Sequence, residues 1–257
     1  MAAAARDWDA ATYDRISDVQ QGWARRVLER LPLRGDETVL DAGCGSGKVT
    51  AMLLERLPDG HVIGVDSAPS MVREAEEALG GPRARFISSD LLDLDVDREA
   101  DAVFSNAVFH WVPDHPRLFQ RLFAALRPGG RLVAQCGGRG NVESFLEVTD
   151  RVAGREPFRD HFEGWRGRPW HFEGPEVTEE ALRLAGFAEI SCWLDPSPET
   201  PEHPDDFLRV VCLGPHLERL PEQIQDEFRA AVREELGEPV VLDYVRLNID
   251  ARRPEDS

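Results

Sequence analysis

Cysteine is scarce in this sequence and lysine is almost absent. The four cysteines, Cys44, Cys136, Cys192 and Cys212, form no C-x-x-C pair, and no histidine accompanies them at zinc spacing. Isolated thiols of this kind are most often small buried hydrophobic residues. Lys48 is the only lysine, so arginine supplies the rest of the fixed positive charge. No disulfide framework and no metal centre are expected.

Long apolar runs and a basic leader are missing as well. No stretch approaches the roughly 20 apolar residues that span a bilayer. The opening MAAAARDWDAATYD places acids directly after a short alanine tract, which is unlike a secretory signal peptide. We therefore expect a cytoplasmic protein with no membrane partner.

Net positive charge is also absent, because the chain of 257 residues carries a formal charge of −18. Such a surface repels a phosphate backbone, and the arginines are scattered among acids without forming a basic groove. A nucleic acid is therefore not expected as partner, which leaves a small molecule as the favoured substrate. The sequence leaves open whether the protein is a monomer or a homodimer.

Strand-like and helix-like segments alternate over the first half of the chain. The segment HVIGVD, for example, precedes the helical PSMVREAEEAL, which has Pro69 at its start and two glycines at its end. This alternation indicates an α/β fold with a Rossmann-like, doubly wound, mostly parallel sheet. The segments AEISCWLD and VVLDYVRLNIDAR predict a hairpin-like final pair, giving seven strands with the last one antiparallel.

The chain reads as one domain, 1–257, with four parts. We predict an N-terminal helical cover over 1–35 and a cofactor-binding core over 36–137. Residues 138–185 are rich in Gly, Arg, Trp and Phe, and they predict a lid-like insertion. The alternative for this insertion is a satellite core with surface cations. Residues 186–257 supply the strands and helices that complete the sheet.

The segment VLDAGCGSGKVT, 39–50, is a glycine-rich loop between a predicted strand and helix. A triphosphate-binding P-loop would need glycine where Ala42 stands and a hydroxyl where Val49 stands. The dinucleotide fingerprint would need glycine at Lys48. Asp41, at the end of the strand, would oppose a pyrophosphate. An acid before G-x-G-x-G instead suits a ligand that carries an ammonium and a carboxylate, as the methionine part of S-adenosylmethionine does.

Polar residues end the following strands. Asp66 ends HVIGVD, where a carboxylate can accept both ribose hydroxyls of an adenosine cofactor. Asp90 and Leu91 follow the third strand, where an acid and a backbone amide can read adenine. Asn106 ends the fourth strand, and ligands of such folds lie at the carboxyl ends of the strands.

Taken in order, VLDAGCGSGKVT, VIGVDSAPSM, SSDLLDL, DAVFSNAVFHW and LRPGGRLV resemble the successive motifs of class I S-adenosylmethionine-dependent methyltransferases, over residues 38–135. The segments WDAATY and SNAVFHWVPDHPRLF are similar to the trans-aconitate and juvenile hormone acid methyltransferases, which act on small carboxylic acids. The resemblance implies S-adenosyl-L-methionine as cofactor, S-adenosyl-L-homocysteine as product, and a carboxylate or hydroxyl oxygen as acceptor. Methylation of carbon or nitrogen in natural-product biosynthesis, and an inactive cofactor-binding protein, are the alternatives.

The same resemblance implies roles for individual residues. The expected cofactor contacts are Asp41, Gly43, Gly45, Gly47, Asp66, Ser67, Met71, Asp90, Leu91 and Asn106, with Tyr13 and Gln20 folding over the cofactor from the N-terminal segment. Each has a structural alternative, such as a turn glycine, a helix cap or, for Met71, core packing.

The acceptor side is expected to be built from a second group of residues. His110, directly after the fourth strand, is the candidate catalytic base, the alternative being a neutral histidine that packs or caps. The expected substrate contacts are Trp23, Trp111, Arg139, Trp165 and Arg166.

Overall fold

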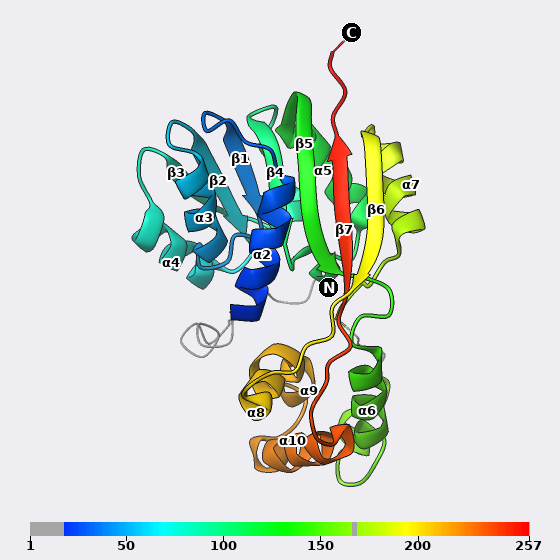
Figure 1. Cartoon of the computed structure of the whole chain (residues 1–257). Helices are drawn as coiled ribbons and strands as arrows, with labels where there is room; N and C mark the ends of the chain where they lie inside the picture. The colour runs from blue at the N-terminus through cyan, green and yellow to red at the C-terminus, as the bar shows by residue number, and fades with distance from the viewer. Residues whose placement is uncertain (1–17, 166–168, 257) are drawn as a thin grey trace.

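The computed structural model describes residues 18–165 and 169–256. Within them, seven strands form one sheet in the order β3-β2-β1-β4-β5-β7-β6 (Figure 1). The strands are β1 (Thr38–Ala42), β2 (His61–Asp66), β3 (Ala84–Ser88), β4 (Ala100–Asn106), β5 (Leu126–Gly137), β6 (Ala188–Pro196) and β7 (Val245–Arg252).

The first five strands pair in parallel, whereas β7 lies antiparallel between β5 and β6. The predicted fold, a Rossmann-like, mostly parallel seven-stranded sheet with an antiparallel last strand, is confirmed. Because β7 runs against β5, its first residues lie at the carboxyl end of β5, with Arg246 opposite Gly137. The two strands thus bring a late segment of the chain to the edge where the other parallel strands end.

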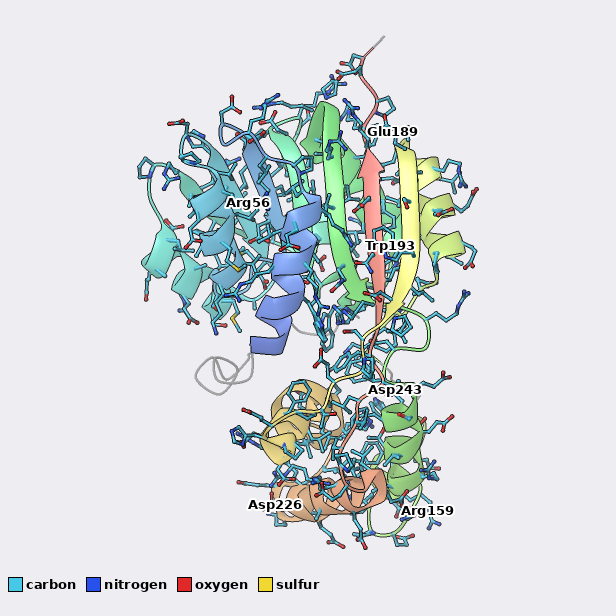
Figure 2. All side chains as sticks on the ribbon, viewed as in Figure 1. Arg56, Arg159, Glu189, Trp193, Asp226 and Asp243 are labelled. Carbon is cyan, nitrogen blue, oxygen red and sulfur yellow. The ribbon has the colours of Figure 1, made fainter. Side chains whose placement is uncertain are left out.

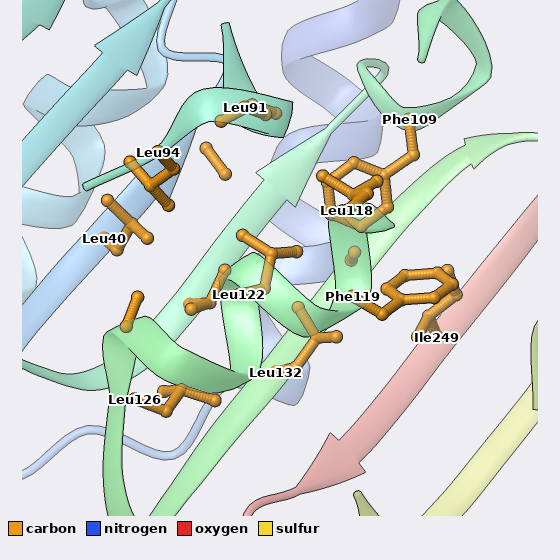
Figure 3. Close-up of a cluster of buried hydrophobic side chains, with 14 of the residues drawn as sticks. Leu40, Leu91, Leu94, Phe109, Leu118, Phe119, Leu122, Leu126, Leu132 and Ile249 are labelled. Atoms are coloured by element: carbon orange, nitrogen blue, oxygen red, sulfur yellow. The ribbon is translucent and has the colours of Figure 1, made fainter. Parts of the chain in front are cut away.

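Helices cover both faces of the sheet. They are α2 (Asp18–Arg30), α3 (Lys48–Arg56), α4 (Pro69–Leu79), α5 (His115–Ala125) and α7 (Pro175–Ala185). One face packs Val27 and Leu28 of α2 and Leu53 of α3 against apolar strand residues. The other face buries α5 and part of α7, with Leu118, Leu122 and Leu132 in its core (Figure 3).

A second group of helices lies beyond the carboxyl edge of the sheet (Figure 1). It contains α6 (Glu143–Ala153), α8 (Pro204–Phe207), α9 (Gly214–Leu217) and α10 (Glu222–Leu236), and we call it the helical module. Its core joins Phe145 and Val152 of α6 to Phe228 and Val232 of α10. Single turns or short irregular helices complete the described chain: η1 (Leu91–Asp93), η2 (Phe109–Trp111), η3 (Arg159–His161) and η4 (Leu208–Cys212).

The limits of this module differ from those predicted for the insertion, 138–185. Helix α7 packs against α5 and β6 rather than in the module, because its buried Ala181 and Leu182 belong to the core of the sheet. Helices α8 to α10, which we assigned to the C-terminal part, instead share a core with α6.

The module joins the sheet at Asp243 (Figure 2). Its carboxylate accepts from the backbone N–H and the hydroxyl of Ser144, at 3.1 and 2.6 Å, and its carbonyl accepts from the N–H of Val142. This residue therefore fixes the start of α6 to the chain that enters β7. None of the described helices combines the length and the apolar character needed to cross a bilayer.

Candidate active site

The glycine loop connects β1 to α3 and is held to β2 by backbone hydrogen bonds. The N–H groups of Gly43 and Cys44 both donate to the carbonyl of Val65, at 2.8 and 3.0 Å. Gly43 has φ +86°, and an added Cβ would lie 2.2 Å from the side chain of Val108. Only glycine fits there without strain or displacement of Val108.

The backbone amides of the glycine loop are bonded within the protein. The N–H of Gly47 donates to Cys44 and that of Gly45 to Asp66, so the amides of the three motif glycines are used within the protein. A carboxylate at the loop would instead meet the amino-terminal end of α3, where the helix dipole favours an anion.

Asp66 ties the loop to the end of β2. Its Oδ2 accepts from Gly45 N–H and its Oδ1 from Ala68 N–H, both at 2.9 Å. A carboxylate offers about four acceptor positions, so two remain, enough for a pair of ribose hydroxyls. The capping and ribose-binding interpretations of Asp66 are therefore compatible. Beside it, a Cβ on Gly45 would meet nothing within 4 Å.

Asp41 is 2 % exposed and accepts a 2.6 Å hydrogen bond from the Thr50 hydroxyl. Burial raises the pKa of Asp41 to about 7; the Thr50 hydrogen bond opposes that rise, and the charge of Asp66 adds to it. Within residues 18–165 and 169–256 no cationic side chain forms an ion pair with Asp41. A buried carboxylate in this state fits a ligand that brings an ammonium.

The remaining predicted cofactor residues lie at the ends of β2, β3 and β4. Ser67 follows Asp66 in the turn before α4, on which Met71 is buried. Asp90 caps η1 by accepting from Leu92 N–H at 2.9 Å, and Leu91 is buried in the sheet core. Asn106 ends β4. The sheet order places these ends side by side with β1, as the sequence predicts. No cluster of three His, Cys, Asp or Glu suited to a metal occurs in the described part of the chain.

His110 lies in η2, just after β4, and is buried. Its Nδ1 accepts from the backbone N–H of Gly137 at 3.2 Å. The pKa of His110 is well below its ordinary value, because burial, the charge of Arg246 and that of His115 all disfavour the imidazolium. A neutral ring that accepts at Nδ1 carries its proton on Nε2, so His110 is fixed as a hydrogen-bond donor.

The comparisons with known proteins agree with this geometry. A sequence family described as "Methyltransferase domain" matches residues 39–130. The trans-aconitate 2-methyltransferase of Methylobacterium nodulans is 31% identical, over 96% of this chain and 98% of the relative. The enzyme of the same name from Shigella flexneri serotype 5b is also 31% identical, over 97% and 99%. The chain belongs to this family of S-adenosylmethionine-dependent methyltransferases.

A solved structure supports the fold. Phosphoethanolamine N-methyltransferase 2 of Haemonchus contortus, in complex with S-adenosyl-L-methionine, superimposes with a TM-score of 0.62 at 20% identity. The match covers 96% of this chain and 56% of that one. The methyltransferase fold thus accounts for the sheet and its helices, and S-adenosylmethionine is the methyl donor of the family. Asp41, Asp66 and the open side of Gly45 fit the charges and hydroxyls of that cofactor.

Four aromatic rings, including that of His110, meet where the sequence predicts the acceptor. The ring of His110 lies 5.5 Å from that of Trp111 and 5.9 Å from that of Phe172, between centroids. Trp170 stacks on Phe172 at 6.0 Å and contacts Trp111 at 5.6 Å. The N–H of His171 donates to the carbonyl of His110 at 2.7 Å. The segment 170–172 therefore packs on η2; that the insertion acts as a lid stays a prediction.

The other predicted substrate residues are not all brought to this place. Trp165 packs on His216 of the helical module, at 4.8 Å between centroids, and the exposed Arg139 pairs with Glu176 at 3.1 Å. Trp23 is buried, with its ring centroid 5.0 Å from that of Tyr244. Tyr13 and Arg166 lie outside the described residues, and of Gln20 only its place on α2 is described.

The sequence interpretation missed Arg246, whose Nε donates to Gln135 Oε1 at 3.4 Å. Arg246 is 3 % exposed, on the face of β7 that also carries Asn248 and Asp250. The signal was present in VRLNID, because polar residues at every second position of a central strand place polar groups on a covered face.

A surface hollow of about 650 Å³ lies elsewhere, between α8 and α10. Its charges pair with one another, as Arg229 does with Asp226 and Arg233 with Asp205. It contains none of the predicted site residues and offers no reactive group.

Proposed function

We propose that this methyltransferase transfers its methyl group to a carboxylate oxygen of a small organic acid. The observation that carries the proposal is the hydrogen bond from Gly137 to Nδ1 of His110. A histidine held in this way, with its pKa well below the ordinary value, has no lone pair available at Nε2 to take a proton. It suits an acceptor that needs no base.

A carboxylate is such an acceptor, because it is already ionised near neutral pH. A hydroxyl acceptor would need a group that removes its proton during the reaction. In the proposed reaction a carboxylate oxygen forms the new bond to the methyl carbon as the carbon–sulfur bond breaks. No proton moves, and the electron pair of the broken bond stays on sulfur.

When bound, the cofactor supplies a methyl group activated by a positively charged sulfur. The chain supplies position and a dry environment. Asp41 and the first turn of α3 hold the charged end of the cofactor, and Asp66 holds its ribose. Nε2–H of His110 donates to the acceptor carboxylate and aims one oxygen at the methyl group, while Trp111, Trp170 and Phe172 exclude water.

The names of the relatives support the same substrate class. Both proteins compared above are called trans-aconitate 2-methyltransferase, and each aligns over nearly its whole length. We therefore propose trans-aconitate, an unsaturated tricarboxylic acid, as the first acceptor to test.

The test uses S-adenosylmethionine labelled in its methyl group, trans-aconitate and the full chain. The expected product is a methyl ester, which releases labelled methanol on mild alkaline hydrolysis. The trimethyl ester of the same acid, which has no ionised carboxylate, is the matched control and should accept no label. Label that resists alkali would show methylation of a hydroxyl, carbon or nitrogen instead.

A further inference from the structure

Arg246 is a buried cation without a carboxylate partner in the described part of the chain. Its Nη2 is shielded from solvent and has no hydrogen-bond acceptor there. Burial lowers the pKa of Arg246 to about 10, which leaves the guanidinium charged near neutral pH. An unpaired buried charge is costly unless something binds it.

Two other arginines at the sheet, Arg253 and Arg30, have acceptors for their guanidinium groups. Arg253, which is also buried, donates to the carbonyls of Phe123 and Leu126, each at 2.8 Å. Arg30, on the same face of the sheet as Arg246, donates to the Ala134 carbonyl and pairs with Asp250 at 3.2 Å. The lack of an acceptor at Nη2 of Arg246 is thus a property of its site.

A second unpaired donor lies against the first. The guanidinium carbon of Arg246 is 4.3 Å from the centroid of the Trp23 ring. The indole N–H of Trp23 is buried and has no acceptor within the described residues. Two donors from contacting side chains, one of them charged, are the groups that an anion with two oxygens would satisfy.

The site borders the acceptor side of the methyltransferase. Arg246 stands opposite Gly137 in the sheet, and the Gly137 N–H is the group that holds His110. The charge of Arg246 also lowers the pKa of His110. Arg246 therefore lies beside the strand end that holds His110, where the acid is proposed to bind.

We propose that Arg246 and Trp23 together bind a second, non-reacting carboxylate of the acceptor, and so select acids with more than one carboxylate. The proposal rests on the carboxylate methylation proposed above. An ion pair with a guanidinium withdraws charge from the carboxylate and makes the carboxylate oxygens poorer nucleophiles. The reacting carboxylate is better held by the neutral donor His110, which leaves Arg246 for the other.

The experiment measures binding without turnover, by calorimetry on the full chain saturated with S-adenosylhomocysteine. The probes are trans-aconitate and crotonate, which keeps a single carboxylate on an unsaturated chain. We expect wild type to bind trans-aconitate at least tenfold more tightly than crotonate. Arg246→Met should abolish this preference by weakening trans-aconitate alone. Trp23→Phe, which keeps the ring but removes the N–H, should weaken it several-fold.

The matched control is Arg252→Met, at the far end of the same strand, where the arginine pairs with Glu189 and Glu255. It should leave both affinities unchanged. Circular dichroism and unaltered S-adenosylhomocysteine binding show that each variant is folded. If Arg246→Met does not fold, the relative affinities of wild type for the two acids still test the proposal.

Equal affinity of wild type for the two acids, or a folded Arg246→Met that keeps the preference, overturns the proposal. Arg246-dependent binding without any ester product would uphold the carboxylate site and reject the proposed function. Ester formation by Arg246→Met with an unchanged KM would uphold the proposed function and reject the second carboxylate site.

Discussion

The hydroxyl of Thr50, in the first turn of α3, donates to the buried carboxylate of Asp41 at 2.6 Å. This bond crosses the glycine loop from the helix back to the strand that precedes it. It stabilises the charged form of Asp41, whereas burial and the charge of Asp66 favour the neutral form, and burial has the larger effect on the pKa. The cofactor end of the site therefore contains an acid that titrates near neutral pH.

Cofactor binding should release a proton from Asp41. With a pKa of about 7, roughly half of the Asp41 side chains are protonated at pH 7, and an arriving ammonium favours the ionised form. Calorimetry of S-adenosylhomocysteine binding in buffers of different ionisation enthalpy should show this release, with affinity rising between pH 6 and 8. Asp41→Asn should abolish the release, and Thr50→Val should shift it to higher pH. Equal proton release in wild type and Asp41→Asn would contradict the assignment.

The same carboxylate should affect stability in the opposite direction. Its pKa in the folded protein is above that of an unfolded chain, so its favourable contribution is complete below about pH 4 and is lost as pH rises through 7. Without ligand, Asp41→Asn should therefore lose less stability than wild type between pH 5 and 8, as measured by urea unfolding.

Gly43 and Gly45 should respond differently to alanine. Both have positive φ, which costs a non-glycine residue about 1–2 kcal/mol, but only at Gly43 would the new methyl group overlap Val108. Gly43→Ala should lose a further ~1–3 kcal/mol from overpacking in urea unfolding. Adding Val108→Ala should restore that further part. If the two single variants are equally destabilised, the close approach of Val108 is not what requires glycine.

Asp66→Ala should weaken S-adenosylhomocysteine binding by ~1.5–3 kcal/mol, the range for hydrogen bonds to a charged group. Because Asp66 also holds the N–H groups of Gly45 and Ala68, the variant alone does not isolate the ribose contact. The 2′,3′-dideoxy analogue of the ligand does. Wild type should prefer the natural ligand, whereas Asp66→Ala should bind both equally; a preference retained by the variant would reject the ribose contact.

The cofactor end of this site could be predicted from sequence because it is local. Most of the predicted contacts lie at the end of a strand or directly after it, and a parallel sheet brings those ends together whatever the loops do. The positions of Gly45 and Asp66 at neighbouring strand ends could therefore be predicted from the sequence alone. The hydrogen bonds of the loop amides did not follow from that pattern, since glycine motifs leave open where each N–H points.

The acceptor end depends on pairings between distant segments. Trp165 was expected beside the substrate, but its partner His216 comes from α9, which no local pattern connects to it. Arg246 reaches the site because β7 inserts antiparallel between β5 and β6, so a residue near the end of the chain meets Gly137. The composition of 138–185 predicted extra structure at this edge, but not that α6 would share a core with α10.

His110→Gln should keep most of the methyl-transfer rate. Glutamine supplies an N–H donor of similar reach, and a carboxylate acceptor loses no proton, so we expect less than about a tenfold loss in kcat and no new pH dependence. A hydroxyl acceptor would make His110 a base, with a loss on the order of 10²–10⁴ and a wild-type rate that rises with pH through the lowered pKa of His110. A loss of that size with intact cofactor affinity would decide against a carboxylate.

The same variant should resist acid better than wild type. In the unfolded chain His110 takes up a proton near pH 6.5, whereas in the folded protein its pKa lies well below that value, mainly because of burial. Its contribution to stability is therefore complete above pH 6.5 and is lost as pH falls, by at most about 1.4 kcal/mol per pH unit. Urea unfolding of wild type and His110→Gln between pH 7.5 and 5 should show the smaller loss in the variant. His115 is also buried with a lowered pKa and contributes to the same loss of stability. His115→Gln is therefore measured beside His110→Gln, to separate the contribution of each histidine. If wild type and His110→Gln lose stability in parallel, His110 takes up its proton in the folded protein as readily as in the unfolded chain, and the environment that keeps its ring neutral is not as assigned here.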